Sequence, residues 1–160
     1  MEAPRGPVTG PPYESRLAEV CARLNHHRAH YVLVGARALQ LWGTTRATKD
    51  IDILIEKTVA NARRVLAALT DVGFRLAGEW AAEEVATKAV TIVGDSPRVD
   101  ILTVAWALHY PEARKDAKVF TVEGVKIPTA SIDHLIKSQR TGRPQDVADI
   151  LVLEEIQRRT

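Results

Sequence analysis

The sequence predicts one α/β domain, because stretches with the apolar spacing of helices alternate along the chain with short β-branched runs typical of strands. The chain has 160 residues, of which 46% are hydrophobic and 26% are charged. This length and composition are typical of a single globular domain that buries a core without disulfides or a structural metal. The net charge of +2 is too close to balance to indicate a nucleic-acid-binding protein by itself.

Residues 1–12 are predicted to be a flexible leader, since proline and glycine dominate them and almost nothing in them is apolar. Residues 13–160 form the predicted domain, and no internal repeat or linker divides them. No apolar run has membrane-spanning length, no signal-peptide pattern is present, and the single Cys21 cannot form an internal disulfide. We therefore expect a cytoplasmic protein that does not bind membranes.

The first half of the domain contains three predicted helices and two predicted strands. The strands are short apolar, β-branched runs, the first of which ends at Gly35. Thr58 is a suitable N-cap, and Gly43 and Gly73 stand where glycine commonly ends a helix. In order, we predict a helix from 17 to about 26, a strand over 31–34, a helix over 36–42, a strand over 50–55 and a helix from 58 to about 72.

The second half is predicted to consist of two hairpins and two closing helices. Strong turn signals, Gly94-Asp95-Ser96-Pro97 and Glu123-Gly124, separate the strands of the two hairpins. Pro144 suits the first position of a helix. The predicted strands cover 85–93, 99–104, 119–122 and 125–127, and the predicted helices cover about 132–140 and 144–157.

Asp50 and Asp52 carry the sharpest chemical signal. Because side chains alternate along a strand, both carboxylates are predicted to leave the same face, and a cation between them would relieve their repulsion. Asp100 lies inside another apolar strand. If that strand pairs beside the first one, three carboxylates converge, as in a two-metal phosphoryl-transfer site. An Asp-x-Asp pair alone is also common at a solvated strand edge.

The segment Val34-Gly35-Ala36 passes from a predicted strand directly into a predicted helix. The free N–H groups and the positive end of the helix dipole at such a turn bind anions, and a glycine lets a phosphate approach the backbone. A glycine at this point can equally serve the geometry of the turn alone.

Together, these residues resemble the signature of the DNA polymerase β-like nucleotidyltransferase superfamily. In that signature a Gly-Ser or Gly-Gly pair precedes a paired acidic motif, as Gly35-Ala36 precedes Asp50-Ile51-Asp52 here after thirteen residues, 37–49. The longer pattern over 32–52 is more narrowly similar to the abortive-infection (AbiEii-like) branch and its minimal bacterial relatives. Elements of the chain's tail agree with it: Lys137, Gly142-Arg143-Pro144, Asp146 and Asp149. The resemblance covers roughly residues 30–155.

The resemblance implies a nucleotidyltransferase fold, in which a mixed central β-sheet is flanked by helices and closed by two C-terminal helices. It implies that Asp50 and Asp52 hold two Mg²⁺ ions, which Mn²⁺ can replace, and that these ions bridge the triphosphate of an NTP such as ATP. Asp100 would bind the catalytic metal and help to deprotonate the attacking hydroxyl group. Gly35 and Ala36 would present backbone N–H groups to the terminal phosphates.

Basic residues are further candidates for the same site. Arg46 would add positive charge beside the phosphates, and Lys137, on the first closing helix, could face the triphosphate. Alternatively, Lys137 or Arg143 pairs with Asp146 and Asp149 and so ties the last two helices together.

The activity implied is Mg²⁺-dependent transfer of NMP from an NTP to a hydroxyl-bearing acceptor, with release of pyrophosphate. Relatives of this kind act on tRNA, on a partner protein or on antibiotics, some of them in toxin–antitoxin or phage-defence systems. A large acceptor is expected to dock on the open side of the sheet or on a surface completed by a second chain, in a homo- or hetero-oligomer. Because Ala36 replaces the usual Ser or Gly, a non-catalytic nucleotide-binding or protein-interaction module is the alternative.

The remaining reactive residue types predict no second site. The five histidines show no paired metal spacing, and one cysteine cannot form a zinc set. We expect Arg37 to be a solvated residue of the first helical turn. Trp42, Trp80 and Trp106 are expected to be packing residues, with stacking on a nucleobase as the alternative.

Overall fold

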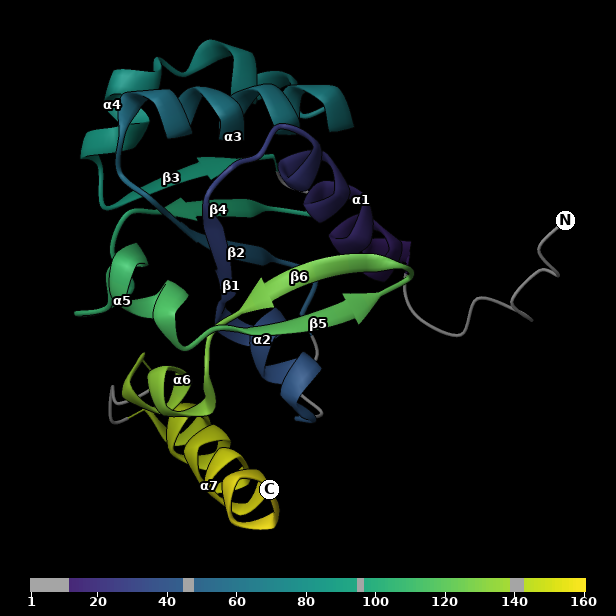
Figure 1. Cartoon of the computed structure of the whole chain (residues 1–160), viewed down its shortest axis with the longest axis vertical. Coiled ribbons are helices and arrows are strands. Elements are labelled where there is room, and N and C mark those ends of the chain that lie inside the picture. Colours follow the sequence, from purple (N-terminus) through teal and green to yellow (C-terminus); the bar gives the residue numbers. More distant parts are fainter. Residues whose placement is uncertain (1–11, 45–47, 95–96, 139–142) are drawn as a thin grey trace, which may run out of the picture.

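A computed structural model describes residues 12–44, 48–94, 97–138 and 143–160, which form a six-stranded sheet with helices packed on it (Figure 1). The strands are β1 (Tyr31–Val34), β2 (Ile51–Ile55), β3 (Val90–Val93), β4 (Val99–Leu102), β5 (Lys118–Val122) and β6 (Val125–Thr129). The helices are α1 (Pro12–His26), α2 (Gly35–Trp42), α3 (Val59–Val72), the 3-10 helix η1 (Arg75–Glu79), α4 (Ala82–Thr87), α5 (Tyr110–Lys115), α6 (Ile132–Ser138) and α7 (Pro144–Arg159).

The sheet is mixed, with the strand order β3-β4-β2-β1-β6-β5. At its centre, β2 is antiparallel to β1 and parallel to β4. β1 is parallel to β6, and the two predicted hairpins, β3–β4 and β5–β6, are antiparallel as expected. The predicted fold class, a mixed sheet flanked by helices, is therefore confirmed.

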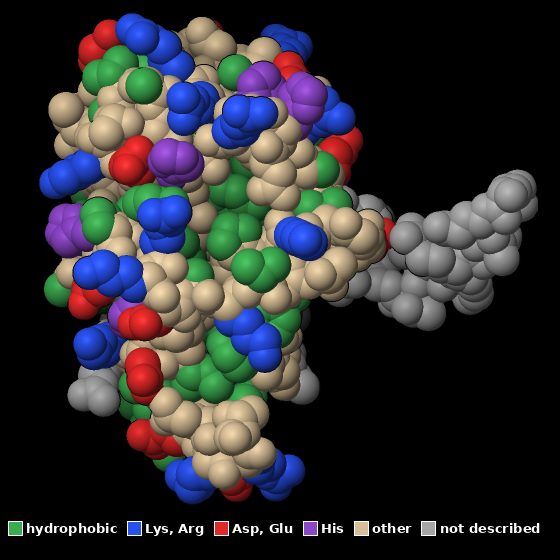
Figure 2. All heavy atoms as spheres, in the orientation of Figure 1, with side chains coloured by type: hydrophobic (Ala, Val, Ile, Leu, Met, Phe, Trp, Pro, Cys, Tyr) green, Lys and Arg blue, Asp and Glu red, His purple; other side chains and the backbone are tan. Residues whose placement is uncertain are grey.

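The helices form groups at opposite ends of the molecule. α1 packs against α3 and α3 against α4, whereas α2 packs against α6 and α7, which also contact each other. Figure 1 shows α3 and α4 at one end of the view and α6 and α7 at the other. None of the described helices is both long and apolar enough to span a membrane. On the face shown in Figure 2, basic and acidic side chains are interspersed, without a broad surface of one sign.

The outermost strand of one sheet edge buries only one face. In β3, Thr91 and Val93 are buried, whereas Val90 and Ile92 are 42% and 46% exposed. Val90 lies opposite Leu102 and Ile92 lies opposite Asp100 in the β3–β4 hairpin. The exposed apolar side chains therefore share a sheet face with Asp100, because paired residues point to the same side.

Most predicted elements are confirmed, but the strand over 85–93 is wrong in its first half. Ala82–Thr87 forms α4, and only Val90–Val93 pairs as β3. Alanine and glutamate favour the helical conformation in this segment, and α4 buries Val85 as it packs against α3. The helices α5 and η1 were not predicted. Of the predicted leader, residues 1–11 lie outside the described residues, as do 139–142 after α6.

Asn61 joins the start of α3 to the segments beside it. Its side chain is buried, and Nδ2 donates hydrogen bonds to the carbonyl oxygens of His30 (3.0 Å) and Glu56 (2.9 Å). Its Oδ1 accepts a hydrogen bond from the His30 N–H at 2.7 Å. One amide side chain thus pairs three backbone groups that belong to the ends of the two central strands.

We expect Asn61→Leu to lower the free energy of unfolding by about 2–4 kcal/mol, because it removes three hydrogen bonds and leaves the His30 N–H without this partner. The carbonyl oxygens of His30 and Glu56 keep their backbone hydrogen bonds from the N–H groups of Glu56 and Thr58. Thr58→Ala is the control: it removes one capping hydrogen bond, from the Asn61 N–H at 3.1 Å, and should cost about 1 kcal/mol. Urea denaturation followed by circular dichroism measures both. Equal losses in the two variants would contradict the central role of Asn61.

Candidate active site

Two of the predicted acidic residues face each other across neighbouring strands. In the parallel β2–β4 pair Asp52 lies opposite Asp100, and in the antiparallel β1–β2 pair it lies opposite Val34, the last residue of β1. Asp52 and Asp100 therefore leave the same face of the sheet. Asp50 immediately precedes β2 and lines the same cavity, and its backbone N–H is bound by Thr48 Oγ1 at 3.2 Å. The pairing that the sequence analysis required is present.

Gly35 brings the backbone into close contact with this acidic group. It has a φ of +71°, and a Cβ built on it would lie 2.1 Å from Asp52 Oδ2. Both the conformation and the space therefore require glycine. Gly35 begins α2, and Val34 at the N-cap provides no side-chain hydrogen bond to the helix. The side chain at the N-cap therefore leaves the first N–H groups of α2 uncapped. These groups lie beside the carboxylates, and uncapped N–H groups at the start of a helix are the usual arrangement for binding an anion.

These residues line a cavity of about 720 Å³, a volume typical of small-ligand sites. Its polar wall comes from the turn into α2, from α6 and from the start of α7. Its opposite wall is apolar and comes from β3, β4 and the segment that follows β4. The lining includes, on the polar side, Gly35, Ala36, Ser138, Arg143 and Asp146, and on the apolar side, Ala89, Val90, Leu102, Val104, Ala105 and Trp106.

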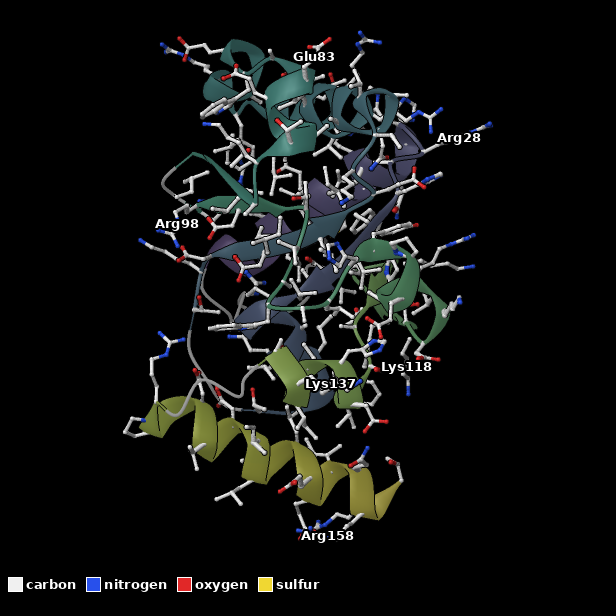
Figure 3. All side chains as sticks on the ribbon, turned by 90° about the vertical axis from the view of Figure 1, so that its left-hand side faces the viewer. Arg28, Glu83, Arg98, Lys118, Lys137 and Arg158 are labelled. Atoms are coloured by element: carbon white, nitrogen blue, oxygen red, sulfur yellow. The ribbon has the colours of Figure 1, made fainter. Side chains whose placement is uncertain are left out.

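Arg98 forms the ion pairs with the carboxylates of the site that are found among the described residues. Its Nε lies 2.9 Å from Asp100 Oδ1, and one terminal nitrogen lies 3.8 Å from Asp50 Oδ2 and donates to Asp100 Oδ2 at 3.2 Å. The Nε–H does not point at Asp100 Oδ1, so this buried oxygen has a close positive charge but no hydrogen-bond donor. Figure 3 shows Arg98 on the same side of the molecule as the start of α7.

Asp52 experiences the strongest electrostatic conflict of the site. Burial raises its pKa from 3.8 to about 7, and the charges of Asp100 and Asp50 add to the increase, while Arg98 opposes it. In the protein alone, a substantial fraction of Asp52 therefore carries a proton near neutral pH. Perturbed carboxyl groups of this kind cluster at functional sites.

No protein-family model and no curated protein matches the chain. Among solved structures, a putative nucleotidyltransferase from Thermotoga maritima is similar, with a TM-score of 0.55 and 16% sequence identity over 91% of each chain. This chain has a nucleotidyltransferase-like fold. The narrower resemblance to the AbiEii-like branch stays a prediction, because structural similarity at this level of identity concerns the fold alone.

In this nucleotidyltransferase-like fold, the carboxylates have the donor chemistry that Mg²⁺ prefers, namely hard oxygen atoms with unmet demand for positive charge. The raised pKa of Asp52 expresses that demand, because the charges of Asp100 and Asp50 disfavour its ionised form, whereas Asp100 already has Arg98 beside it. Within the described ranges, however, no three His, Cys, Asp or Glu side chains are gathered as a ready-made metal group. The residues fit a divalent cation by chemistry, and its binding belongs to the proposal below.

The other predicted site residues have different positions. Ala36 lines the cavity beside Gly35. Arg46 lies outside the described residues. Lys137 is exposed on α6 and, in Figure 3, lies away from Arg98; it does not belong to the described lining of the cavity. Its predicted contact with the triphosphate stays a prediction.

Two other expectations about basic residues have clear outcomes. Arg143 does pair with Asp146, at 3.0 Å, and this pair lies within the first turn of α7. Arg37 is not solvated as expected. It is only 3% exposed, because α2 packs against α6 and α7 on one side and the sheet on the other.

The tryptophans divide into packing and exposed residues. Trp42 packs as expected: its Nε1–H donates to the Ala130 carbonyl at 2.8 Å, and its ring contacts Phe120 edge-on at 5.2 Å. Trp106 is 63% exposed and lines the cavity, so the expectation that it is a packing residue is wrong.

Sequence reasoning missed Arg98 as a site residue and gave Trp106 a site role only as the stacking alternative, although alternation along β4 offered a signal. Arg98 precedes Asp100 by two residues, and Leu102, Val104 and Trp106 continue the same series of even positions. Cys21, in contrast, is excluded from the chemistry. It is a free buried thiol, and burial raises its pKa to about 12.

Proposed function

We propose that the protein is a Mg²⁺-dependent nucleotidyltransferase that moves NMP from an NTP to a hydroxyl-bearing acceptor and releases pyrophosphate. The observation that carries this proposal is the contact between the Gly35 turn and Asp52, which places an anion-binding helix start directly beside the acidic cluster. The similarity of the fold to a nucleotidyltransferase structure supports the same class of reaction.

The chain's own groups have separate tasks in the proposed reaction. The N–H groups at Gly35 and Ala36 bind the terminal phosphates, and the carboxylates of Asp50, Asp52 and Asp100 hold the cation. When bound, Mg²⁺ supplies charge neutralisation at the triphosphate. The acceptor oxygen forms a bond to the α-phosphorus, the bond from that phosphorus to the β-phosphate oxygen breaks, and pyrophosphate leaves with the electron pair. Asp100 accepts the hydroxyl proton.

A non-catalytic nucleotide-binding module is the second candidate, and one observation favours it. Arg98 already provides a positive charge at two of the three carboxylates, as a chain without a metal would need. Ala36 also replaces the Ser or Gly that is usual at this position in the superfamily that the sequence resembles. Calorimetry with Mg²⁺ and each NTP, paired with a pyrophosphate-release assay, separates the two candidates, because the module binds a nucleotide without releasing pyrophosphate.

The decisive experiment identifies the acceptor. The protein is incubated with each labelled NTP, Mg²⁺ and total cell extract, and label is then sought in RNA, in protein and in small molecules. We expect label in one of these fractions, as a toxin, antitoxin or defence enzyme of this superfamily would produce. Pyrophosphate release without a labelled product indicates transfer to water. The absence of both pyrophosphate and labelled product would contradict the proposed function.

A further inference from the structure

We infer that Trp106 is the stacking platform for the terminal nucleobase of the acceptor, and that the acceptor is the single-stranded end of a nucleic acid with a free ribose hydroxyl group. This inference rests on the proposed function and names the substrate class of the same cavity. The indole is 63% exposed at the cavity lining, where an aromatic side chain has no packing role.

The backbone holds Trp106 in a conformation that its residue type disfavours. Ala105 and Leu108 exchange two backbone hydrogen bonds of 2.9 Å, so Trp106 and Ala107 form a two-residue turn. Trp106 has a φ of +58°, and among the described non-glycine residues only Arg28 and Glu123 share a positive φ. Glycine is the usual residue at the first position of such a turn. Strain of this kind at a cavity points to a functional side chain.

The apolar wall continues from Asp100 to Trp106. Leu102 lies two residues beyond Asp100 on β4, about 7 Å along the strand. Val90, opposite Leu102, is exposed on the same face, and Val104 extends the wall to the turn. The described cavity therefore combines an aliphatic floor with an indole and a carboxylate in one lining, which suits a flat ring attached to a hydroxyl-bearing sugar.

The strand order assigns this wall to the acceptor. β1 and Gly35 lie on one side of β2, and β4 with Asp100 lies on the other. The attacking and leaving oxygens of a phosphoryl transfer are roughly in line. If pyrophosphate leaves toward Gly35, the attacking hydroxyl enters from the side of Asp100 and the apolar wall. The polar wall, with Ser138 and Asp146, is then left for the donor nucleotide.

A nucleoside offers both a ring for Trp106 and a hydroxyl group for Asp100, which a protein hydroxyl does not. In a tyrosine the hydroxyl is on the ring itself, so the ring would lie at Asp100, and serine or threonine offers no ring at all. In a nucleoside the sugar separates the hydroxyl from the base. Base stacking on an aromatic side chain tolerates any sequence, because every base has a π-face.

The test compares Trp106→Ala, Trp106→Phe and the control Trp80→Phe, which alters a tryptophan outside the cavity lining. The acceptor probes are five-nucleotide single-stranded RNAs with a free 3′ end, and serine- or tyrosine-containing peptides. We expect Trp106→Ala to raise the KM for RNA about 5- to 100-fold, the effect of losing one base stack. The KM for the NTP should change less than twofold, and Trp106→Phe should restore most of the affinity.

Two readouts do not depend on turnover. RNA should quench the tryptophan fluorescence of the wild-type protein and of Trp80→Phe, but not that of Trp106→Phe. Trp106→Gly should raise the melting temperature, since glycine relieves the positive φ, while it raises the KM for RNA as Trp106→Ala does.

The outcomes separate this inference from the proposed function. An unchanged KM for RNA in Trp106→Ala, a raised KM for the NTP alone, or transfer to peptides but not to RNA would each overturn the role of Trp106 while transferase activity stands. If wild-type protein labels nothing, in RNA, peptides or cell extract, the proposed function fails and the inference fails with it.

Discussion

Asp52→Asn is expected to lower nucleotide transfer at least about 1000-fold, as loss of a group that stabilises transition-state charge commonly does. The same change should stabilise the protein in the absence of metal at pH 8. Asp52 is the residue opposite both Val34 and Asp100, and it is the one in contact with the Gly35 turn. An amide of the same shape keeps this position but carries no charge.

The stability effect has a defined pH dependence. The pKa of Asp52 rises from 3.8 to about 7 in the folded protein, so folding favours the protonated form. The resulting penalty is absent below pH 4, grows as the pH increases from 4 to 7, and is complete above pH 7. Asp52→Asn removes it and should raise the melting temperature at pH 8 by several degrees, with a smaller increase at pH 5.

Thermal unfolding in the presence of a chelator, at pH 5 and pH 8, measures this effect. Glu112→Gln is the control, because its carboxylate is exposed on α5 and lies outside the cavity. Addition of Mg²⁺ and NTP should stabilise the wild-type protein and hardly affect Asp52→Asn. Undiminished transfer by Asp52→Asn would show that Asp52 has no part in the reaction. If the melting temperatures of Asp52→Asn and of the wild-type protein changed equally with pH, the raised pKa of Asp52 would be contradicted.

Gly35→Ala is expected to abolish transfer and to destabilise the fold. A Cβ at this position would overlap Asp52 Oδ2 at 2.1 Å, and the half-buried aspartate side chain is too short to give way as the end of a long side chain would. The residue must also keep a positive φ to turn β1 into α2. The two effects together should cost about 3–5 kcal/mol, with displacement of the Asp52 carboxylate as the main reason for lost activity.

Gly124→Ala separates conformational strain from contact. Gly124 has a φ of +81°, close to that of Gly35, but nothing lies within 4 Å of a Cβ built there. This variant should lose about 1 kcal/mol and retain full transfer activity. Urea unfolding and the nucleotide-transfer assay measure both variants. Equal losses of stability in the two variants would show that the positive φ, and not the contact with Asp52, is the reason that position 35 requires glycine.

The local part of the site was predictable from sequence. Asp50 and Asp52 leave one strand on the same side because side-chain alternation is a property of the strand itself. Thr58, Gly43 and Gly73 marked helix ends because capping and left-handed turns depend on the residues at those positions. The position of Gly35 between a strand and a helix was also predictable, because the turn depends on the residues next to it in the sequence.

Other features depend on residues far apart in the chain, and the sequence left them open or gave a wrong prediction. The parallel pairing of β2 with β4 decides that Asp100 joins Asp52. Packing of α2 against α6 and α7 buries Arg37, and packing against α3 makes a helix of a segment whose valines indicated a strand. Burial and long-range pairing depend on the free energy of the whole core, which local periodicity does not contain.

The sequence by itself therefore determined the local features: the types of residue, their spacing and the glycine turn between a strand and a helix. Only the tertiary structure decided the geometry. It placed the Asp100 carboxylate beside Asp52, brought Arg98 within 2.9 Å of it, and exposed Trp106 on the opposite wall. The physical reason is that residue type and alternation are local, whereas convergence of side chains on one cavity requires strands that are distant in sequence to pair in one register.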